Sequence, residues 1–233
     1  MTSPIPRRHW HSAWSGHQRK AMLFDLDGTL LDTAPDLVGA VNLLRREQNL
    51  APIPVKTLRP FISQGARGMI TQGLGIPEHD AAFEPAKQRF LQIYGENLVQ
   101  GTTFWPGMES VVQRLEEKEI AWGIVTNKMM RFTEPLLKTL NLWDRCAVVV
   151  GGDTAAYAKP HPAPLQHAIE ILGLPQAAVT YVGDDLRDIQ SGFAAGCWTI
   201  ACDFDQHTHA PKPHDWGADA VIQTPLELLE KIG

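Results

Sequence analysis

Short apolar runs alternate with helical patterns along most of the chain, and this alternation restricts the fold more than any other feature. Helical spacing of apolar residues separates several of the runs, over 108–119, 132–140 and 164–172. Strands that alternate with helices predict parallel β-α-β units, so the expected fold class is α/β, with a Rossmann-like doubly wound parallel sheet. Six runs have the length and composition of buried strands: 21–24, 121–125, 147–150, 179–182, 198–201 and 220–222.

The segment 36–102 interrupts this alternation because it contains no convincing strand. Prolines and glycines separate its helical patterns. We therefore expect an inserted all-helical domain over 36–102, and an α/β core formed by 21–35 and 103–233. The expected helices of the insertion are 37–48, 56–61, 66–73 and 81–94.

Charge and hydropathy exclude several classes of function. The 233 residues carry 21 Lys and Arg against 26 Asp and Glu, a net charge of −5, which argues against nucleic-acid binding. No run of about 18 apolar residues occurs, so no membrane-spanning helix is expected. Residues 1–20 hold basic residues and no acid, and we expect them to form a mobile tail. Three cysteines without a CxxC pair favour the reducing cytoplasm.

Polar residues follow four of the predicted strands, and ligands of open parallel sheets bind at the carboxyl ends of strands. Clustered carboxylates from two strand ends suit a hard cation such as Mg²⁺, and two carboxylates permit one nucleophile and one proton carrier. Each residue taken alone has an ordinary explanation as a turn, a helix cap or a surface charge. Only their combination indicates a site: Asp25 and Asp27, then Thr126 and Asn127, then Lys159, then Asp184, Asp185 and Asp188.

Four motifs built on these residues resemble the haloacid dehalogenase superfamily of phosphatases in both order and spacing. The resemblance covers about 21–230, and the helical insertion is similar to the C1 cap of that family. The motifs are Phe24-Asp25-Leu26-Asp27-Gly28-Thr29-Leu30, Val125-Thr126-Asn127, Lys159-Pro160, and Val182-Gly183-Asp184-Asp185 with Asp188 three residues on.

The resemblance implies a mechanism and a role for each residue. Asp25 is the expected nucleophile, which forms an aspartyl-phosphate, and Asp27 is the expected acid and base. Mg²⁺ is expected to bind a side-chain oxygen of Asp25, the backbone carbonyl of Asp27, and Asp184. The phosphate-binding residues implied are Thr126, Asn127 and Lys159. Asp185 and Asp188 are expected to support Lys159 or metal-bound water.

Within the superfamily, the chain resembles the phosphoglycolate phosphatases, and segments such as 62–69 resemble N-acetylmuramic acid 6-phosphate phosphatases. The implied substrate is a small phosphomonoester, foremost N-acetylmuramic acid 6-phosphate from peptidoglycan recycling, with 2-phosphoglycolate as the alternative. Both carry a carboxylate, which Arg67 is expected to bind, with Lys128 as a second candidate. No nucleic-acid or membrane partner is expected, and the protein is expected to be a monomer or homodimer.

Two other classes share some of these features. A phosphosugar mutase of the β-phosphoglucomutase type has the same core motifs and a C1 cap, but it would rebind its bisphosphate intermediate rather than release phosphate. A phospholigand-binding protein on the same fold would need no catalytic set. The presence of Asp25, Asp27, Lys159 and Asp184 argues against this last class.

Overall fold

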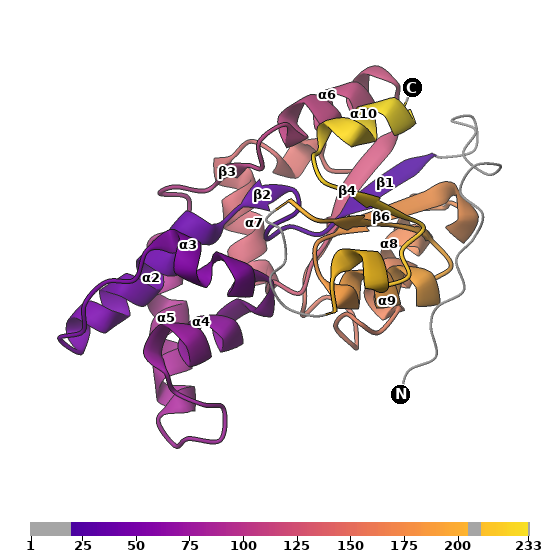
Figure 1. Ribbon diagram of the computed structural model, residues 1–233. Helices are drawn as coiled ribbons and strands as arrows, with labels where there is room; N and C mark the ends of the chain where they lie inside the picture. Colours follow the sequence, from indigo (N-terminus) through magenta and orange to yellow (C-terminus); the bar gives the residue numbers. More distant parts are fainter. Residues whose placement is uncertain (1–19, 205–210, 233) are drawn as a thin grey trace.

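The computed structural model describes residues 20–204 and 211–232. The predicted tail lies outside the described residues except for Lys20. A helical block lies beside an α/β block, and the chain passes from one to the other near β2 and β3 (Figure 1). Among the described residues, no helix combines the length and apolar character that a bilayer span requires.

A six-stranded sheet forms the centre of the α/β block, and every neighbouring pair of strands in it is parallel. The strand order is β5-β4-β1-β6-β7-β8, so β1 lies between β4 and β6. The strands match the predicted runs to within a residue at each end, which confirms the α/β class. They are β1 Ala21–Phe24, β4 Ala121–Val125, β5 Val148–Val150, β6 Val179–Gly183, β7 Trp198–Cys202 and β8 Ala220–Ile222.

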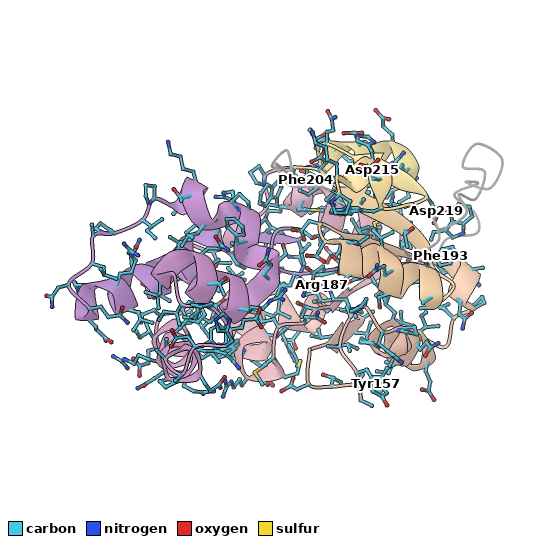
Figure 2. All side chains as sticks on the ribbon, turned by 60° about the horizontal axis from the view of Figure 1, so that its bottom comes forward. Tyr157, Arg187, Phe193, Phe204, Asp215 and Asp219 are labelled. Carbon is cyan, nitrogen blue, oxygen red and sulfur yellow. The ribbon has the colours of Figure 1, made fainter. Side chains whose placement is uncertain are left out.

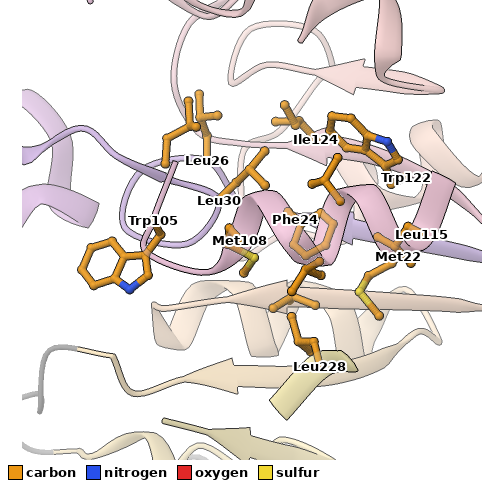
Figure 3. Close-up of a cluster of buried hydrophobic side chains, with 14 of the residues drawn as sticks. Met22, Phe24, Leu26, Leu30, Trp105, Met108, Leu115, Trp122, Ile124 and Leu228 are labelled. Carbon is orange, nitrogen blue, oxygen red and sulfur yellow. The ribbon is translucent and has the colours of Figure 1, made fainter. Parts of the chain in front are cut away.

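Helices cover both faces of this sheet. Met22 and Phe24 of β1 pack in one apolar cluster with side chains of α6 and α10 (Figure 3). Ala21 and Leu23 belong to a second cluster with α8. Alternate residues of a strand point to opposite faces, so β1 is buried on both sides, as its unbroken apolar run predicts. The helices of the block are α6 Met108–Glu117, α7 Met130–Thr139, α8 Ala163–Leu172, α9 Leu186–Ala194 and α10 Leu226–Ile232; its 3₁₀ turns are Trp143–Arg145, Gln176–Ala178 and Pro213–Asp215.

The helical insertion, defined here as α2 to α5, has its own apolar cluster, which Phe132 of α7 joins from the α/β block. The predicted helix 56–61 is two shorter pieces, because Pro60 lacks the backbone N–H that an α-helical continuation needs. The predicted boundaries at 36 and 102 stay predictions. The elements are α2 Ala34–Glu47, α3 Val55–Leu58, the 3₁₀ helix η1 Arg59–Gln64, α4 Gly65–Leu74 and α5 Phe83–Glu96.

A two-stranded antiparallel ribbon joins the insertion to the α/β block. Strand β2 (Leu31–Asp32) enters the insertion and β3 (Thr103–Phe104) leaves it. Sequence periodicity does not predict this ribbon, because two-residue strands are too short to show an alternating pattern. The ribbon places both crossings of the chain side by side.

Candidate active site

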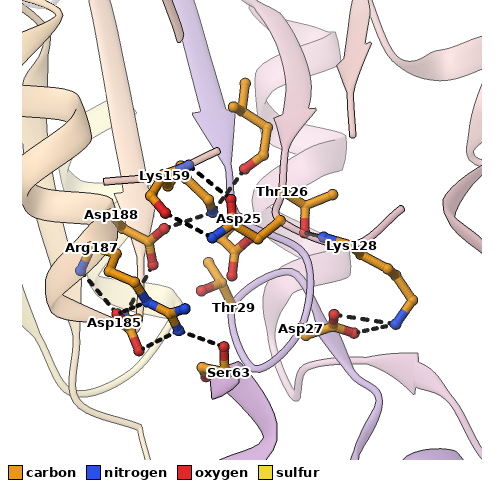
Figure 4. Close-up of polar contacts among 12 residues, drawn as sticks. Asp25, Asp27, Thr29, Ser63, Thr126, Lys128, Lys159, Asp185, Arg187 and Asp188 are labelled. Carbon is orange, nitrogen blue, oxygen red and sulfur yellow. Dashed lines mark hydrogen bonds and ion pairs between the residues drawn. The ribbon is translucent and has the colours of Figure 1, made fainter. Parts of the chain in front are cut away.

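The central position of β1 determines which strand ends meet. Phe24 pairs with Ile124 of β4 on one side and with Val182 of β6 on the other. Asp25 therefore leaves the sheet between Thr126, which follows β4, and Asp184, which follows β6. Figure 4 shows the resulting group of polar side chains. The structure thus brings together residues that the sequence analysis selected from separate strand ends.

Lys159 is buried among the acids at this edge. Its Nζ donates to Oδ1 of Asp25 and to Oδ1 of Asp188, each at 2.7 Å. It also lies 3.1 Å from the carbonyl oxygen of Val125 and 2.8 Å from the Tyr181 hydroxyl, which itself donates to that carbonyl. Burial alone would lower the pKa of Lys159, but the charges of Asp188 and Asp25 outweigh burial and raise it. The lysine therefore stays charged.

Asp25, Asp184 and Asp188, here called the acidic cluster, each offer a carboxylate oxygen within 4.8 Å of the others. Burial, and then the charges of Asp25 and Asp188, raise the pKa of Asp184 well above its usual value. Burial, with repulsion from Asp25, raises the pKa of Asp188 to about 6, although Lys159 opposes this change. Three buried carboxylates face one ammonium, so the cluster fits a hard divalent cation that prefers oxygen ligands.

Two residues of the first motif shape the position of Asp184. The Thr29 hydroxyl donates to Oδ1 of Asp184 at 2.7 Å. Gly28 has a left-handed φ of 88°, and a Cβ atom there would lie 2.6 Å from Oδ2 of Asp184. Any larger residue at Gly28 would be strained and would displace this carboxylate. From the helical insertion, the Ser63 hydroxyl donates to Oδ2 of Asp184 at 2.6 Å, a contact that the sequence analysis did not predict.

Asp27 lies outside the acidic cluster, and its carboxylate pairs with Lys128. The Lys128 Nζ is 3.0 and 3.2 Å from the two carboxylate oxygens, and both side chains are largely buried. Burial would lower the pKa of Lys128, but the charge of Asp27 outweighs burial and raises it. The same ammonium lies 4.6 Å from the ring centre of Tyr94 on α5. Lys128 thus connects Asp27, the expected acid and base, with the helical insertion.

The Thr126-Asn127 pair faces the same region and also organises its backbone. The side-chain amide of Asn127 accepts a hydrogen bond from the backbone N–H of Lys159 at 2.9 Å and donates to the carbonyl of Lys159 at 3.0 Å. The Thr126 hydroxyl accepts from the backbone N–H of Lys128 at 3.2 Å. The Asn127 side chain therefore fixes the loop that carries Lys159, which the sequence analysis did not anticipate.

Asp185 and Asp188 differ in their contacts, although the sequence analysis grouped them. Asp188 contacts Lys159, as expected. Asp185 caps the N-terminus of α9 and accepts two hydrogen bonds from the Arg187 guanidinium, at 2.8 and 2.9 Å. Arg187 also donates to the backbone carbonyl of Ser63 at 2.6 Å. Arg187 lies where the helical insertion meets the α/β block (Figure 2), so this pair links the two.

A cavity of about 250 Å³ lies between the helical insertion and the sheet edge. Carboxylates, Thr126, Asn127, Lys128 and Lys159 line it toward the sheet, whereas its insertion side is mostly apolar but includes Lys87. Arg67 does not line this cavity; its side chain is exposed and lies 3.5 Å from Glu78. The contacts of Arg67 therefore do not support the expected carboxylate-binding role. The apolar lining residues include Leu37, Ile62, Phe90, Leu91 and Phe132.

Comparison with known proteins identifies the family of this chain. Residues 22–202 match the family model described as haloacid dehalogenase-like hydrolase. The chain is 37% identical over 211 residues to an N-acetylmuramic acid 6-phosphate phosphatase of Pseudomonas aeruginosa, covering 91% of this chain and 93% of the relative. It is 40% identical over 211 residues to a phosphoglycolate phosphatase of Xanthomonas campestris, covering 91% and 95%. The chain therefore belongs to the haloacid dehalogenase-like hydrolases.

Within that family the chain is a phosphoric monoester hydrolase, as the sequence motifs predicted. Solved structures agree on the fold: a haloacid dehalogenase-like hydrolase from Streptococcus pneumoniae superposes with a TM-score of 0.78 at 19% identity, covering 93% of this chain and 100% of that chain. Phosphatases of the family generally use a divalent metal, and the acidic cluster provides oxygen donors for one.

Proposed function

We propose that this phosphatase hydrolyses N-acetylmuramic acid 6-phosphate to N-acetylmuramic acid and phosphate. Relatives that are 37% and 38% identical carry that activity in their names. Relatives that are 40% identical are named phosphoglycolate phosphatases, so 2-phosphoglycolate is the alternative substrate. Sequence identity does not separate the two, and the choice between them depends on the cavity.

The size and lining of the cavity favour the sugar phosphate. At about 250 Å³ the cavity approaches the lower end of the range for small-molecule sites, roughly 300–1,000 Å³. A two-carbon acid would leave much of it unfilled and would offer only one methylene group to its apolar side. N-acetylmuramic acid offers a sugar ring and two methyl groups to that side, and a carboxylate besides. This match is the observation that carries the proposal.

Asp25 is the proposed nucleophile. Among the described hydrogen bonds, only its Oδ1 accepts from a side chain, that of Lys159, so its second oxygen is available to attack phosphorus. The attack forms an aspartyl-phosphate and releases N-acetylmuramic acid, whose 6-oxygen leaves as a hydroxyl group. Water then hydrolyses the acyl phosphate and regenerates the Asp25 carboxylate.

Asp27 is the proposed acid and base of both half-reactions. It gives a proton to the leaving alcohol and then takes one from the attacking water. Asp27 lies two residues beyond Asp25, and both residues line the cavity, which supports this role. Thr126, the backbone N–H of Asn127 and the Lys159 ammonium are the proposed partners of the phosphoryl oxygens.

We propose Mg²⁺ as the metal, held by a side-chain oxygen of Asp25, the backbone carbonyl of Asp27 and Asp184. A bound Mg²⁺ would offset the charge of the phosphoryl group and of the attacking carboxylate. Ser63 and Thr29 would hold the Asp184 carboxylate in place through the hydrogen bonds described above.

A comparison of kcat/KM tests the substrate. The purified protein with Mg²⁺ is expected to hydrolyse N-acetylmuramic acid 6-phosphate with a higher kcat/KM than 2-phosphoglycolate. A ratio in the other direction would replace the proposal with its alternative. The same assay with a hexose 1-phosphate separates hydrolysis from mutase chemistry, because a mutase yields the 6-phosphate isomer rather than free phosphate.

The proposed location is the cytoplasm. Cys146, Cys197 and Cys202 are not joined in disulfides, which fits a reducing compartment. The expectation of a monomer or homodimer stays a prediction. It is checked by light scattering on the purified protein.

A further inference from the structure

Tyr94, on the last turns of α5, has a buried hydroxyl without a hydrogen-bond partner among the described residues. Its side chain is 2% exposed, and the residue lines the cavity. Leaving a buried donor without an acceptor costs about 1–3 kcal/mol, so most native proteins avoid it. Such a group at the wall of a cavity indicates that a ligand supplies the missing acceptor.

Lys128 adds a second donor next to this hydroxyl. Its ammonium has three N–H groups, and the hydrogen bonds described for its Nζ go to the two oxygens of Asp27. The remaining N–H group makes no further hydrogen bond of good geometry among the described residues, although the Tyr94 hydroxyl is close enough to help raise the pKa of Lys128. Since the ammonium lies 4.6 Å from the Tyr94 ring centre, both donors reach the same part of the cavity.

The surroundings of this pair favour a carboxylate as the ligand group. Two donors, one of them cationic, match the two oxygens of a carboxylate in a region shielded from water. The walls beside them are apolar, and they include Phe90 and Phe132. A second phosphate is less suitable, because the Asp27 carboxylate already shares the charge of Lys128.

We propose that Tyr94 and Lys128 bind the carboxylate of the substrate and so determine specificity for acidic phosphomonoesters. This inference rests on the proposed function in one respect, that the substrate carries a carboxylate. It replaces Arg67, which the sequence analysis selected for that role, with a residue of α5 that no motif marked. Lys128 then has two neighbours in the complex, Asp27 and the substrate carboxylate.

Two pairs of substrates test the proposal. N-acetylmuramic acid 6-phosphate is compared with N-acetylglucosamine 6-phosphate, which lacks the lactyl carboxylate, and 2-phosphoglycolate is compared with ethyl phosphate. Tyr94→Phe is expected to raise KM about 10-fold or more for the preferred acidic substrate, the loss typical of a hydrogen bond to a charged group. Its effect on the partner without a carboxylate is expected to stay within about 2-fold, since the ring remains.

Tyr157→Phe is the matched control, because Tyr157 is 61% exposed and does not line the cavity. This variant is expected to behave as wild type with all four substrates. Lys128→Met is expected to lose activity on all four, because it also removes the partner of Asp27, but to lose more on the acidic members. Tyr94→Phe is expected to keep or raise the wild-type Tm, since it removes a buried hydroxyl without a partner.

The outcomes separate the two proposals. Suppose that wild type prefers 2-phosphoglycolate and that Tyr94→Phe raises KM for 2-phosphoglycolate but not for ethyl phosphate. The proposed substrate is then wrong, and the carboxylate site stands. If Tyr94→Phe changes both members of a pair by the same factor, or neither, the carboxylate site is wrong. A lower Tm in Tyr94→Phe would also overturn it, because the hydroxyl would then have a partner in the free protein.

Discussion

The buried Lys159 ammonium compensates two carboxylates at once, Asp25 and Asp188. We predict that Lys159→Met lowers the free energy of unfolding by about 3–5 kcal/mol, because it leaves buried charges without a partner. Adding Asp188→Asn to this variant is expected to recover part of the loss. Urea denaturation checks both values.

Lys138→Met is the control for that experiment, because Lys138 forms an exposed ion pair with Glu134 on α7. Exposed pairs contribute little, so this variant is expected to change stability by less than about 1 kcal/mol. Equal losses in the Lys159 and Lys138 variants would contradict the assignment of Lys159 as a buried counter-ion.

The division of labour between Asp25 and Asp27 leads to a second prediction. Asp25→Asn is expected to abolish phosphate release and to leave no phosphorylated protein, because an amide does not attack phosphorus. Asp27→Asn is expected to slow both half-reactions about 10²–10⁴-fold while substrate binding persists. Intact-mass spectrometry after rapid acid quench, together with phosphate release, checks this. Phosphate release by Asp25→Asn at the wild-type rate would refute the proposed nucleophile.

Among single residues, the sequence predicted the acids and Lys159, but not the contacts of the acids with Ser63 and Lys128. Asp25, Asp184 and Lys159 follow strand ends, and parallel strands place their ends at one edge. The contact between Ser63 and Asp184 spans 121 positions and depends on how the insertion docks, which no local pattern encodes. The pairing of Lys128 with Asp27 likewise depends on side-chain direction at two separate strand ends.

Among the elements, α9 illustrates how a cap near the site affects stability. Its N-terminus has a reciprocal capping box, in which Asp185 accepts from the Arg187 backbone N–H and Asp188 accepts from that of Asp185. We predict that Asp185→Ala costs about 1 kcal/mol of unfolding free energy, whereas Asp185→Asn, which preserves the cap, costs clearly less. Chemical denaturation of the two variants checks the difference. Equal losses would assign the effect to the ion pair with Arg187 rather than to the cap.

The six sheet strands were predictable because each is a short, mainly apolar run, and all except the edge strands β5 and β8 are almost completely buried. The start of α2 was not, since the helix begins at Ala34, three residues before the expected start at residue 37. Asp36 explains the difference: its carboxylate, within the first turn, accepts hydrogen bonds from the backbone N–H groups of Gly101 and Thr102, so a polar residue is buried just before the expected start of the helix.

For the whole molecule, the charge of the acidic cluster predicts a link between pH, metal and stability. The pKa of Asp188 is about 6 in the folded protein against an ordinary 3.8. Between these values the folded state binds more protons than the unfolded chain. The contribution of this group is therefore fully present below about pH 4 and is lost as the pH rises through about 6.

Divalent metal is expected to offset this loss, because a cation held by Asp25 and Asp184 would stabilise the neighbouring ionised Asp188. The Tm difference between samples with Mg²⁺ and with EDTA is therefore expected to widen from about pH 5 to about pH 7. Differential scanning calorimetry at matched ionic strength measures it. A difference that narrows over this interval would show that the cluster does not hold the metal.

The ribbon of β2 and β3 has a consequence for how such enzymes diversify. Leu31 lies opposite Phe104 and Asp32 opposite Thr103, so the two ends of the insertion are about 5 Å apart. The two ends of any domain inserted between β2 and β3 therefore need to be only one strand spacing apart, whatever the length of that domain. The α/β block could thus carry different insertions at this junction. Phe132, which packs into the apolar cluster of the insertion, is one side chain that each exchanged insertion would have to accommodate.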